Sequence, residues 1–457
     1  MARAINDSTA PSTAPLDTPT MPAPDSADLD RLYRKITLRL MPLLFLCYLF
    51  AFLDRINIGY AKLEMSSDLG FSEAVYGLGA GIFFFSYLLF EVPSNMLLER
   101  VGARLTMLRI LVLWGITSSA TLFVSSPTQF YVARFLLGVF EGGFFPGIIL
   151  YLTYWFPSTR RGLVTGMFMF AVPIAGILGG PVSGMIMTGM DGAGGMRGWQ
   201  WMFLLEGIPS VLLGLVCYFY LADKPSKAKW LSAAEQQLVA RTLAADKDSQ
   251  PGAAHGHAAG QFRAAVTDGR VWVLALIYFS AACGNYAFTF WLPTMIKSLG
   301  VSSLTQIGWY SAIPYLFAGF GVLGVSWSSD RSRERRWHVA ASLIVAAAAL
   351  SLTTLTTHSF AGSMALLCVV GFFEFGAAIL FWAIPPTYLS KEAAPVGIAM
   401  VSSIGVIGGF VSPTLLGFIK SQTGSLDAGM YAVAGIMVIG GLMTLVALPA
   451  KALKVGT

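Results

Sequence analysis

The chain has 457 residues, of which 55% are apolar and 12% are charged, and its mean hydropathy is +0.67. Soluble domains carry about 25% charged residues, and one core could not bury so much apolar surface, so a water-soluble globular protein is excluded. The net charge of +6 does not indicate a nucleic-acid partner, because the basic residues lie in short loops between apolar runs.

Residues 1–30 are rich in Ser, Thr, Ala, Pro and Asp, which predicts a disordered cytoplasmic tail and no signal peptide. Long apolar runs then recur along the chain. A helix needs about 20 apolar residues to cross a bilayer, and its backbone must satisfy its own hydrogen bonds there, so each run predicts a transmembrane helix. The twelve predicted helices span residues 38–60, 75–97, 106–124, 128–152, 163–187, 201–222, 271–294, 308–328, 339–357, 363–389, 394–419 and 429–449.

A polar stretch at 223–270 separates the sixth run from the seventh and predicts a solvated cytoplasmic linker. It divides the chain into two parts of nearly equal length, 31–222 and 271–450, with 451–457 as a C-terminal tail. The predicted fold is an all-α membrane protein, with twelve transmembrane helices in two six-helix bundles.

Two sequence features occur once in each half. The acidic-Arg pairs at Glu99 and Asp330 are 231 residues apart, because 330 − 99 is 231. The Phe-Glu-x-Gly motifs at Glu141 and Glu374 are 233 residues apart, because 374 − 141 is 233. Two features that keep almost the same offset indicate an internal repeat of one six-helix unit.

Positive charge alternates between the two sides of the predicted membrane. If the N-terminus lies in the cytoplasm, four of the 30 Lys and Arg residues lie in outer loops and two lie within spans. The remaining 24 fall in cytoplasmic segments. Cytoplasmic loops are enriched in Lys and Arg, so both termini are predicted to face the cytoplasm. The four residues assigned to outer loops are Lys62, Arg197, Lys297 and Lys420.

The turn after the second run, Glu99-Arg100-Val-Gly-Ala-Arg, and its echo Asp330-Arg331-Ser-Arg resemble the loop signature of the major facilitator superfamily. Further stretches resemble its anion:cation symporter branch, which carries organic anions such as tartrate, hexonates, phthalate and hydroxyphenylacetate. The resemblance covers residues 31–450 apart from the central linker. The stretches are Asp54-Arg55-x-Asn57, Glu91-Val-Pro93-Ser-Asn95, Arg134-x3-Gly138-x2-Glu141, Tyr151-x2-Tyr154-Trp155-Phe156-Pro157 and Glu206-Gly207-x-Pro209.

Four charged residues lie deep in the first and fourth runs: Asp54, Arg55, Arg134 and Glu141. A charge at mid-bilayer costs ~2.5–3.5 kcal/mol, so such residues usually serve function, although static ion pairs between two helices are the alternative. Ionised together, the four sum to zero. A bound monocarboxylate would leave one negative charge, and one added proton would restore neutrality. The sequence therefore predicts that an anion is coupled to a proton.

The resemblance implies a role for each of these residues. Asp54 and Glu141 correspond to the proton-responsive acids of related symporters. Arg55 corresponds to the arginine that binds the substrate anion. A guanidinium can donate two parallel hydrogen bonds to a carboxylate. Arg134 corresponds to a partner of Glu141 within the substrate site.

Specificity is expected from aromatic and hydroxyl side chains. Tyr87 matches a position that contacts substrate in related proteins, Trp382 is expected to supply an apolar wall together with Tyr286, and Ser402 stands where some relatives have Asn. These residues favour an aromatic or short hydroxy acid.

Three further acids lie within predicted spans. Glu91 and Glu206, each shortly before a proline, are expected to form helix-packing hydrogen bonds, whereas Glu374 could be a further protonation site.

The expected function is proton-coupled import of a small organic carboxylate by alternating access. Glu99, Arg100, Asp330 and Arg331 are expected to latch the cytoplasmic side. The alternatives are a proton-driven antiporter that exports drugs or metabolites and a non-transporting nutrient sensor. An enzyme is not expected, because no HExxH, GxSxG or P-loop motif occurs.

The expected partners follow from this function. They are a small organic anion and membrane lipid, with no nucleic acid, no metal and no cofactor besides the coupling proton. The chain is expected to act as a monomer in a bacterial inner membrane.

Overall fold

The computed structural model describes residues 26–248, 258–390 and 393–449. Within these ranges twelve helical stretches are long and apolar enough to cross a membrane, and each overlaps one predicted run, so the predicted spans are confirmed. The helices of the first bundle are α1 (Ser26–Leu69), α2 (Glu73–Val101), α3 (Ala103–Ala120), α4 (Pro127–Glu141), α5 (Phe144–Thr153), α6 (Ser158–Met169), α7 (Ala171–Gly189) and α8 (Gly198–Tyr220).

The linker and the second bundle complete the fold. α4 with α5 and α6 with α7 each make one broken crossing, and α15 is a short extension after α14. The remaining helices are α9 (Ala233–Asp248), α10 (Ala258–Thr267), α11 (Gly269–Ser298), α12 (Leu304–Ser332), α13 (Arg336–Thr353), α14 (Phe360–Phe381), α15 (Pro385–Tyr388), α16 (Ala394–Thr423) and α17 (Asp427–Ala447).

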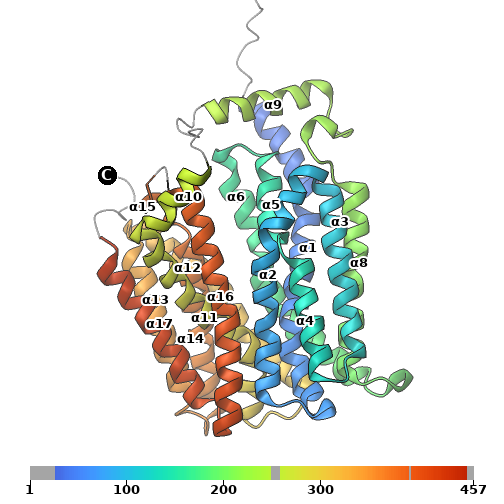
Figure 1. The fold of residues 1–457 in the computed structure, drawn as a ribbon, viewed down its shortest axis with the longest axis vertical. Coiled ribbons are helices and arrows are strands. Elements are labelled where there is room, and N and C mark those ends of the chain that lie inside the picture. Colours follow the sequence, from blue (N-terminus) through green and yellow to red (C-terminus); the bar gives the residue numbers. More distant parts are fainter. Residues whose placement is uncertain (1–25, 249–257, 391–392, 450–457) are drawn as a thin grey trace, which may run out of the picture.

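The two bundles form the two arms of the molecule in Figure 1, with α1–α8 on one side and α11–α17 on the other. We call the end that carries the start of α1 together with α9 and α10 the linker end, and the opposite end, with the loops at 190–197, 299–303 and 424–426, the far end. α7 packs on α12 and α2 packs on α16 across the interface.

Glycines allow the bundles to meet closely in the far half. A Cβ at Gly77 of α2 would lie 2.4 Å from the Pro413 carbonyl of α16, and one at Gly180 of α7 would lie 2.4 Å from the Gly308 carbonyl of α12. Backbones can approach this closely only where side chains are absent. The bundles are therefore closed against each other at the far end.

The polar linker contains ordered helix at 233–248, and residues 233–246 are exposed or half-buried apart from Val239, so the solvated linker stays a prediction. The Lys35 ammonium of α1 contacts Glu235 of α9 at 2.8 Å. Asp246 accepts a hydrogen bond from the Ser158 amide at 3.0 Å, and it forms an ion pair with Arg161 at 2.9 Å. These contacts hold α9 on the first bundle. The predicted tail also ends sooner than expected, because α1 begins at Ser26, while residues 1–25 lie outside the described residues.

Replacing Asp246 by Ala should release α9 from the bundle, with several-fold faster proteolysis of the linker at neutral pH. Hydrogen bonds from Ser158 hold the pKa of Asp246 below its usual value. A carboxylate with a lowered pKa stabilises the docked state above its unfolded pKa, and this contribution is lost as pH falls through the folded pKa. Wild-type and variant cleavage rates should therefore converge in acid, and equal rates at pH 7 would contradict the docking role.

Candidate functional site

An ion pair between α1 and α4 lies at the centre of the first bundle's inner face. Arg55 Nη2 contacts Glu141 Oε1. The Glu141 side chain is 1% exposed and that of Arg55 is 11% exposed. α4 ends at Glu141, and Gly143, with φ of +90°, turns the backbone into α5 against Ser94. The broken crossing therefore places Glu141 at a helix end, facing Arg55.

Aromatic rings surround Arg55. Its Cζ lies 5.4 Å from the ring centroid of Phe83 and 5.8 Å from that of Tyr87, both on α2. Such ring faces attract a guanidinium. The fold thus places Tyr87 beside Arg55, and its role in substrate binding stays a prediction.

The second bundle contributes Tyr286 of α11 to the same place. Tyr286 interacts electrostatically with Arg55, and its ring centroid lies 4.2 Å from that of Phe84 on α2. The sequence predicted Tyr286 only as an apolar wall. The fold places it between the bundles, packed on Phe84 and near Arg55, and nothing in the sequence signals this position.

Arg134 does not pair with Glu141, and that prediction is wrong for this conformation. Its Nε donates to the Gly79 carbonyl of α2 at 3.3 Å, and its Cζ lies 5.0 Å from the Phe83 ring centroid. The two residues are seven positions apart, about 10 Å along the helix, and the Arg134 side chain extends toward α2. No carboxylate of the described chain forms an ion pair with it.

Asp54 lies apart from the other three residues. Its carboxylate accepts hydrogen bonds from Ser118 Oγ of α3 at 3.0 Å and from Ser210 Oγ of α8 at 2.8 Å. Neighbouring helix residues point about 100° apart, so Arg55 faces the second bundle while Asp54 faces the interior of the first. The expectation that all four charges form one group is therefore wrong. Of the four residues, Arg55, Arg134 and Glu141 remain as candidates for the side that faces the second bundle.

The interfacial charges retain unused hydrogen-bonding capacity. Arg55 Nε, Arg134 Nη2 and Glu141 Oε2 are buried, and none has a hydrogen-bond partner within the described ranges. Two arginines and one carboxylate leave a net charge of +1. Buried donors without partners are costly, and a carboxylate fits both the charge and the free N–H groups.

Two predicted specificity residues lie elsewhere in the second bundle. Trp382 follows α14, and its ring centroid is 4.6 Å from that of Tyr278 of α11. Ser402 is half-buried on α16. The roles of Trp382 and Ser402 in binding stay predictions.

The predicted latch residues are exposed at the linker end. Among the described residues no ion pair joins Glu99, Arg100, Asp330 or Arg331. The latching role of these four residues stays a prediction.

A charged network instead closes the far end. Lys62 of α1 contacts Glu73 of α2 at 2.6 Å, and Glu73 contacts Lys420 of α16 at 2.7 Å. Lys62 Nζ also donates to Thr294 Oγ1 of α11 at 3.2 Å and lies 3.7 Å from the Trp291 ring centroid. We call Lys62, Glu73 and Lys420 the far-end latch.

Sequence reasoning missed this latch. It assigned Lys62 and Lys420 to outer loops, but α1 continues to Leu69 and α16 to Thr423, so both lie within helices. The signal was available, since both lysines sit within a turn or two of long apolar runs.

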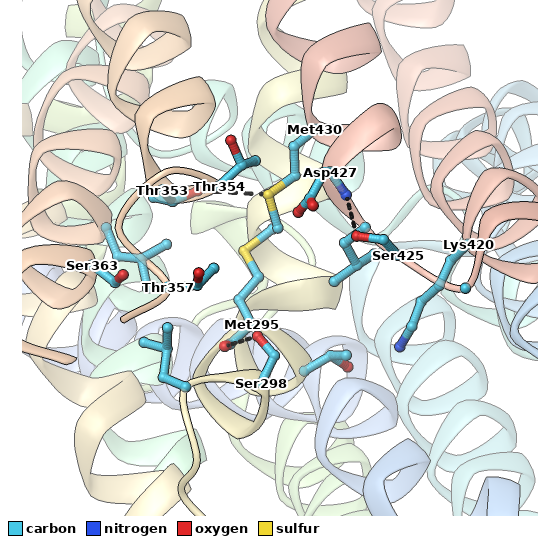
Figure 2. A pocket seen from close by; sticks show the side chains of 15 residues that line it. Met295, Ser298, Thr353, Thr354, Thr357, Ser363, Lys420, Ser425, Asp427 and Met430 are labelled. Carbon is cyan, nitrogen blue, oxygen red and sulfur yellow. Dashed lines mark hydrogen bonds between the residues drawn. The ribbon is translucent and has the colours of Figure 1, made fainter. Parts of the chain in front are cut away.

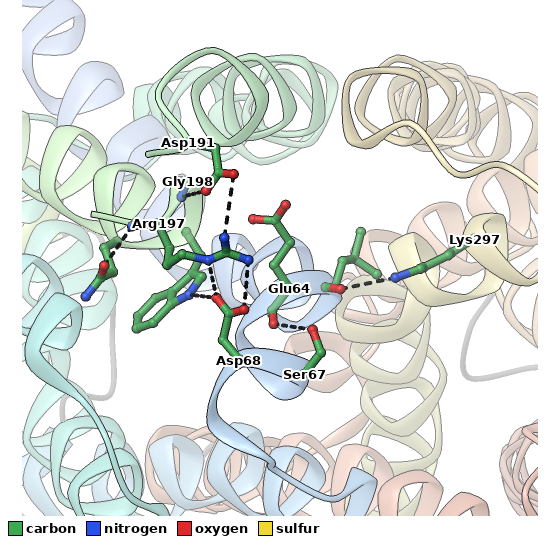
Figure 3. Close-up of polar contacts among 10 residues, drawn as sticks. Glu64, Ser67, Asp68, Asp191, Arg197, Gly198 and Lys297 are labelled. Carbon is green, nitrogen blue, oxygen red and sulfur yellow. Dashed lines mark hydrogen bonds and ion pairs between the residues drawn. The ribbon is translucent and has the colours of Figure 1, made fainter. Parts of the chain in front are cut away.

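Two further features lie at the far end. A cavity of about 230 Å³ lies in the second bundle. Figure 2 shows Lys420 and Asp427 among the side chains that line it. In Figure 3, Arg197 binds Asp68 through two hydrogen bonds of 2.9 Å, and Lys297 donates to a carbonyl of α1 at 3.1 Å. The Arg197–Asp68 contact ties the loop before α8 to the end of α1, and the Lys297 contact joins the bundles.

Comparison with known proteins gives consistent results. The family model described as Major Facilitator Superfamily matches residues 44–413. Over 425 residues the chain is 48% identical to a protein of Agrobacterium vitis named "Putative tartrate transporter", covering 92% of this chain and 96% of that protein. It is 40% identical over 411 residues to a "Quinolone resistance transporter" of Acinetobacter baumannii, covering 90% and 93% of the two chains.

A solved structure shares the fold. It is the inward-facing, occupied form of a bacterial homologue of the human lysosomal transporter Spinster, with a TM-score of 0.72 and 16% identity, covering 91% of this chain and 97% of that chain.

Proposed function

Because the chain belongs to the Major Facilitator Superfamily and is thus a membrane transporter and not an enzyme, we propose that it is a proton-coupled symporter that imports a small organic carboxylate. The observation that carries this proposal is the buried Arg55–Glu141 pair of the first bundle, which Tyr286 of the second bundle approaches, with unpartnered donors on both Arg55 and Arg134. The 48% identical relative is named for tartrate, which favours a hydroxy acid as the substrate.

The geometry supports a linkage between proton and anion. Glu141 forms an ion pair with the Arg55 guanidinium, the group to which a substrate carboxylate would bind. A proton on Glu141 removes the negative charge that holds Arg55, so the arginine becomes available to the substrate. Proton binding and anion binding then favour each other, with protons as the coupling ion and no further cofactor.

The excess of Lys and Arg at the linker end supports a cytoplasmic location for that end. With the far end closed and the linker end unlatched, the conformation is then inward-facing in a bacterial inner membrane. Alternating access would rock one bundle against the other around the Arg55 site.

A screen of hydroxy, aromatic and sugar carboxylates in proteoliposomes at two pH values identifies the substrate. Asp54→Asn and Glu141→Gln should fold normally and lower pH-gradient-driven uptake at least about tenfold, because each removes a group that takes up a proton. Undiminished pH-driven uptake in both variants would reject the proposal.

The 40% identical relative named for quinolone resistance favours a second candidate, a proton-driven exporter. The direction of flux separates the two functions. A symporter accumulates tartrate inside liposomes when the outside is acidic, whereas an antiporter accumulates its substrate when the inside is acidic.

A further inference from the structure

A second group of buried polar side chains lies inside the first bundle, on the side of α1 that faces away from the Arg55 site. Asp54 and Asn57 are three residues apart on α1, and Glu206 and Ser210 are four apart on α8. Residues at these spacings share a helix face. Since Ser210 donates to Asp54, the two faces oppose each other, with Glu206 one turn from the Asp54 contact.

Glu206 has its own polar surroundings. Its Oε1 accepts a hydrogen bond from Ser183 Oγ of α7 at 2.7 Å, and the Asn57 amide faces it. Glu206 Oε2 and both polar atoms of Asn57 are buried without a hydrogen-bond partner among the described residues. Glu206 is 3% exposed and Asn57 is 0% exposed.

The two acids of this group interact electrostatically. The other charged or titratable groups that face them are Glu141 toward Asp54 and Tyr60 toward Glu206. In the described chain neither acid forms an ion pair with Lys, Arg or His. Two buried carboxylates without a cation cannot both stay ionised cheaply, so the pair holds at least one proton.

Helices pack closely around this group. A Cβ at Gly115 of α3 would lie 2.7 Å from the Gly207 carbonyl, next to Glu206 on α8. The Ser183–Glu206 bond also ties α7 to α8, which matches the packing role that the sequence predicted for Glu206. A packing role alone would be served equally well by an uncharged amide.

The positions of the two acids define a direction. α8 begins at Gly198 at the far end, so Glu206 lies about 6 Å closer to that end than Ser210 does. α1 runs toward the far end, so Asn57 likewise lies closer to it than Asp54. Glu206 therefore stands between the far end and Asp54.

We propose that Glu206 is a proton-carrying residue that receives a proton from the far end and passes it to Asp54. In this step an O–H bond on Glu206 breaks and an O–H bond on Asp54 forms. Ser210, one turn from Glu206 on α8, already donates to Asp54. The total charge of the pair is unchanged. The inference rests on the proposed proton coupling.

The test compares two transport modes of the full-length protein in proteoliposomes, with labelled tartrate or the best acid of the screen as the probe. Glu206→Gln should lower the initial rate of uptake driven by an acid exterior at least about tenfold, since an amide cannot carry the proton. Counterflow exchange without a pH gradient should stay within about twofold of wild type, since exchange does not require the acid to lose its proton. Glu206→Asp should recover part of the driven uptake.

Glu64→Gln is the control. Glu64 lies on α1 near the far end, and its Oε2 is buried without a hydrogen-bond partner within the described residues. This variant should retain both transport modes, and loss of driven uptake equal to that of Glu206→Gln would overturn the assignment to Glu206.

Two other results would also overturn it. One is uptake driven by the pH gradient in Glu206→Gln at the rate of the wild type. The other is equal loss of driven uptake and exchange in a folded variant, which indicates a binding or structural role. Wild-type uptake that does not respond to the pH gradient would reject the proposed symport itself. A wild-type response that Glu206→Gln retains would reject only the role of Glu206.

Discussion

Arg55→Ala should abolish carboxylate uptake, with a fall of about 100-fold or more in the rate at subsaturating substrate. The variant removes the guanidinium that we propose binds the substrate, and it leaves Glu141, 1% exposed, without its counter-charge. Truncating one partner of a buried charge pair at a binding site costs about 2–5 kcal/mol of binding free energy, and each 1.4 kcal/mol corresponds to a factor of ten.

Two further variants separate binding from stability. Arg55→Lys retains the charge but lacks the bidentate fork, so it should fold normally and bind the substrate more weakly than wild type. The double variant Arg55→Ala with Glu141→Gln removes the unpaired charge, and should regain thermal stability without regaining uptake. Uptake at the wild-type rate by the double variant would show that Arg55 does not bind the substrate.

Glu73→Gln should open the far end. Glu73 is the acid that joins Lys62 of the first bundle to Lys420 of the second. Its loss leaves Lys62, 4% exposed, beside a neutral amide. Because the Glu73 side chain is 30% exposed, we expect a shift of about 1–2 kcal/mol, less than for a fully buried pair, or about tenfold in the population of the open state.

Cysteine labelling measures this shift. Thr414 of α16 donates to the Gly77 carbonyl of α2 at 3.3 Å, so a cysteine at position 414 reports on separation of the bundles. On a background without the four native cysteines, Glu73→Gln should raise its labelling rate by an impermeant maleimide about tenfold. Glu64→Gln, at the same end of α1 but outside the latch, should leave the rate unchanged, and a rise in both variants would indicate general loosening.

The twelve spans could be predicted from the sequence because hydrophobicity over about 20 residues depends only on local composition. Helix ends were harder to predict. Polar residues such as Lys62 and Lys420 continue a helix when neighbouring helices bury them, and composition alone carries no information on those neighbours.

The charged residues of the site were also identified from the sequence, because a charge inside an apolar run is costly wherever it lies. The pairing of these residues was not predicted correctly. The sequence linked Glu141 to Arg134 on its own helix, whereas the fold pairs it with Arg55 of α1. It also grouped Asp54 with these residues, whereas the fold directs Asp54 toward Ser118 and Ser210.

What the sequence determined by itself is the number of membrane crossings, their division into two bundles and the set of buried charges, since each depends on residue types and spacing along one chain. Only the tertiary structure decided which charges meet, which end is closed, and that Glu206 lies on the far-end side of Asp54. These properties depend on the rotation and packing of helices that lie far apart in the sequence, 86 residues in the case of Arg55 and Glu141, and no local pattern specifies them.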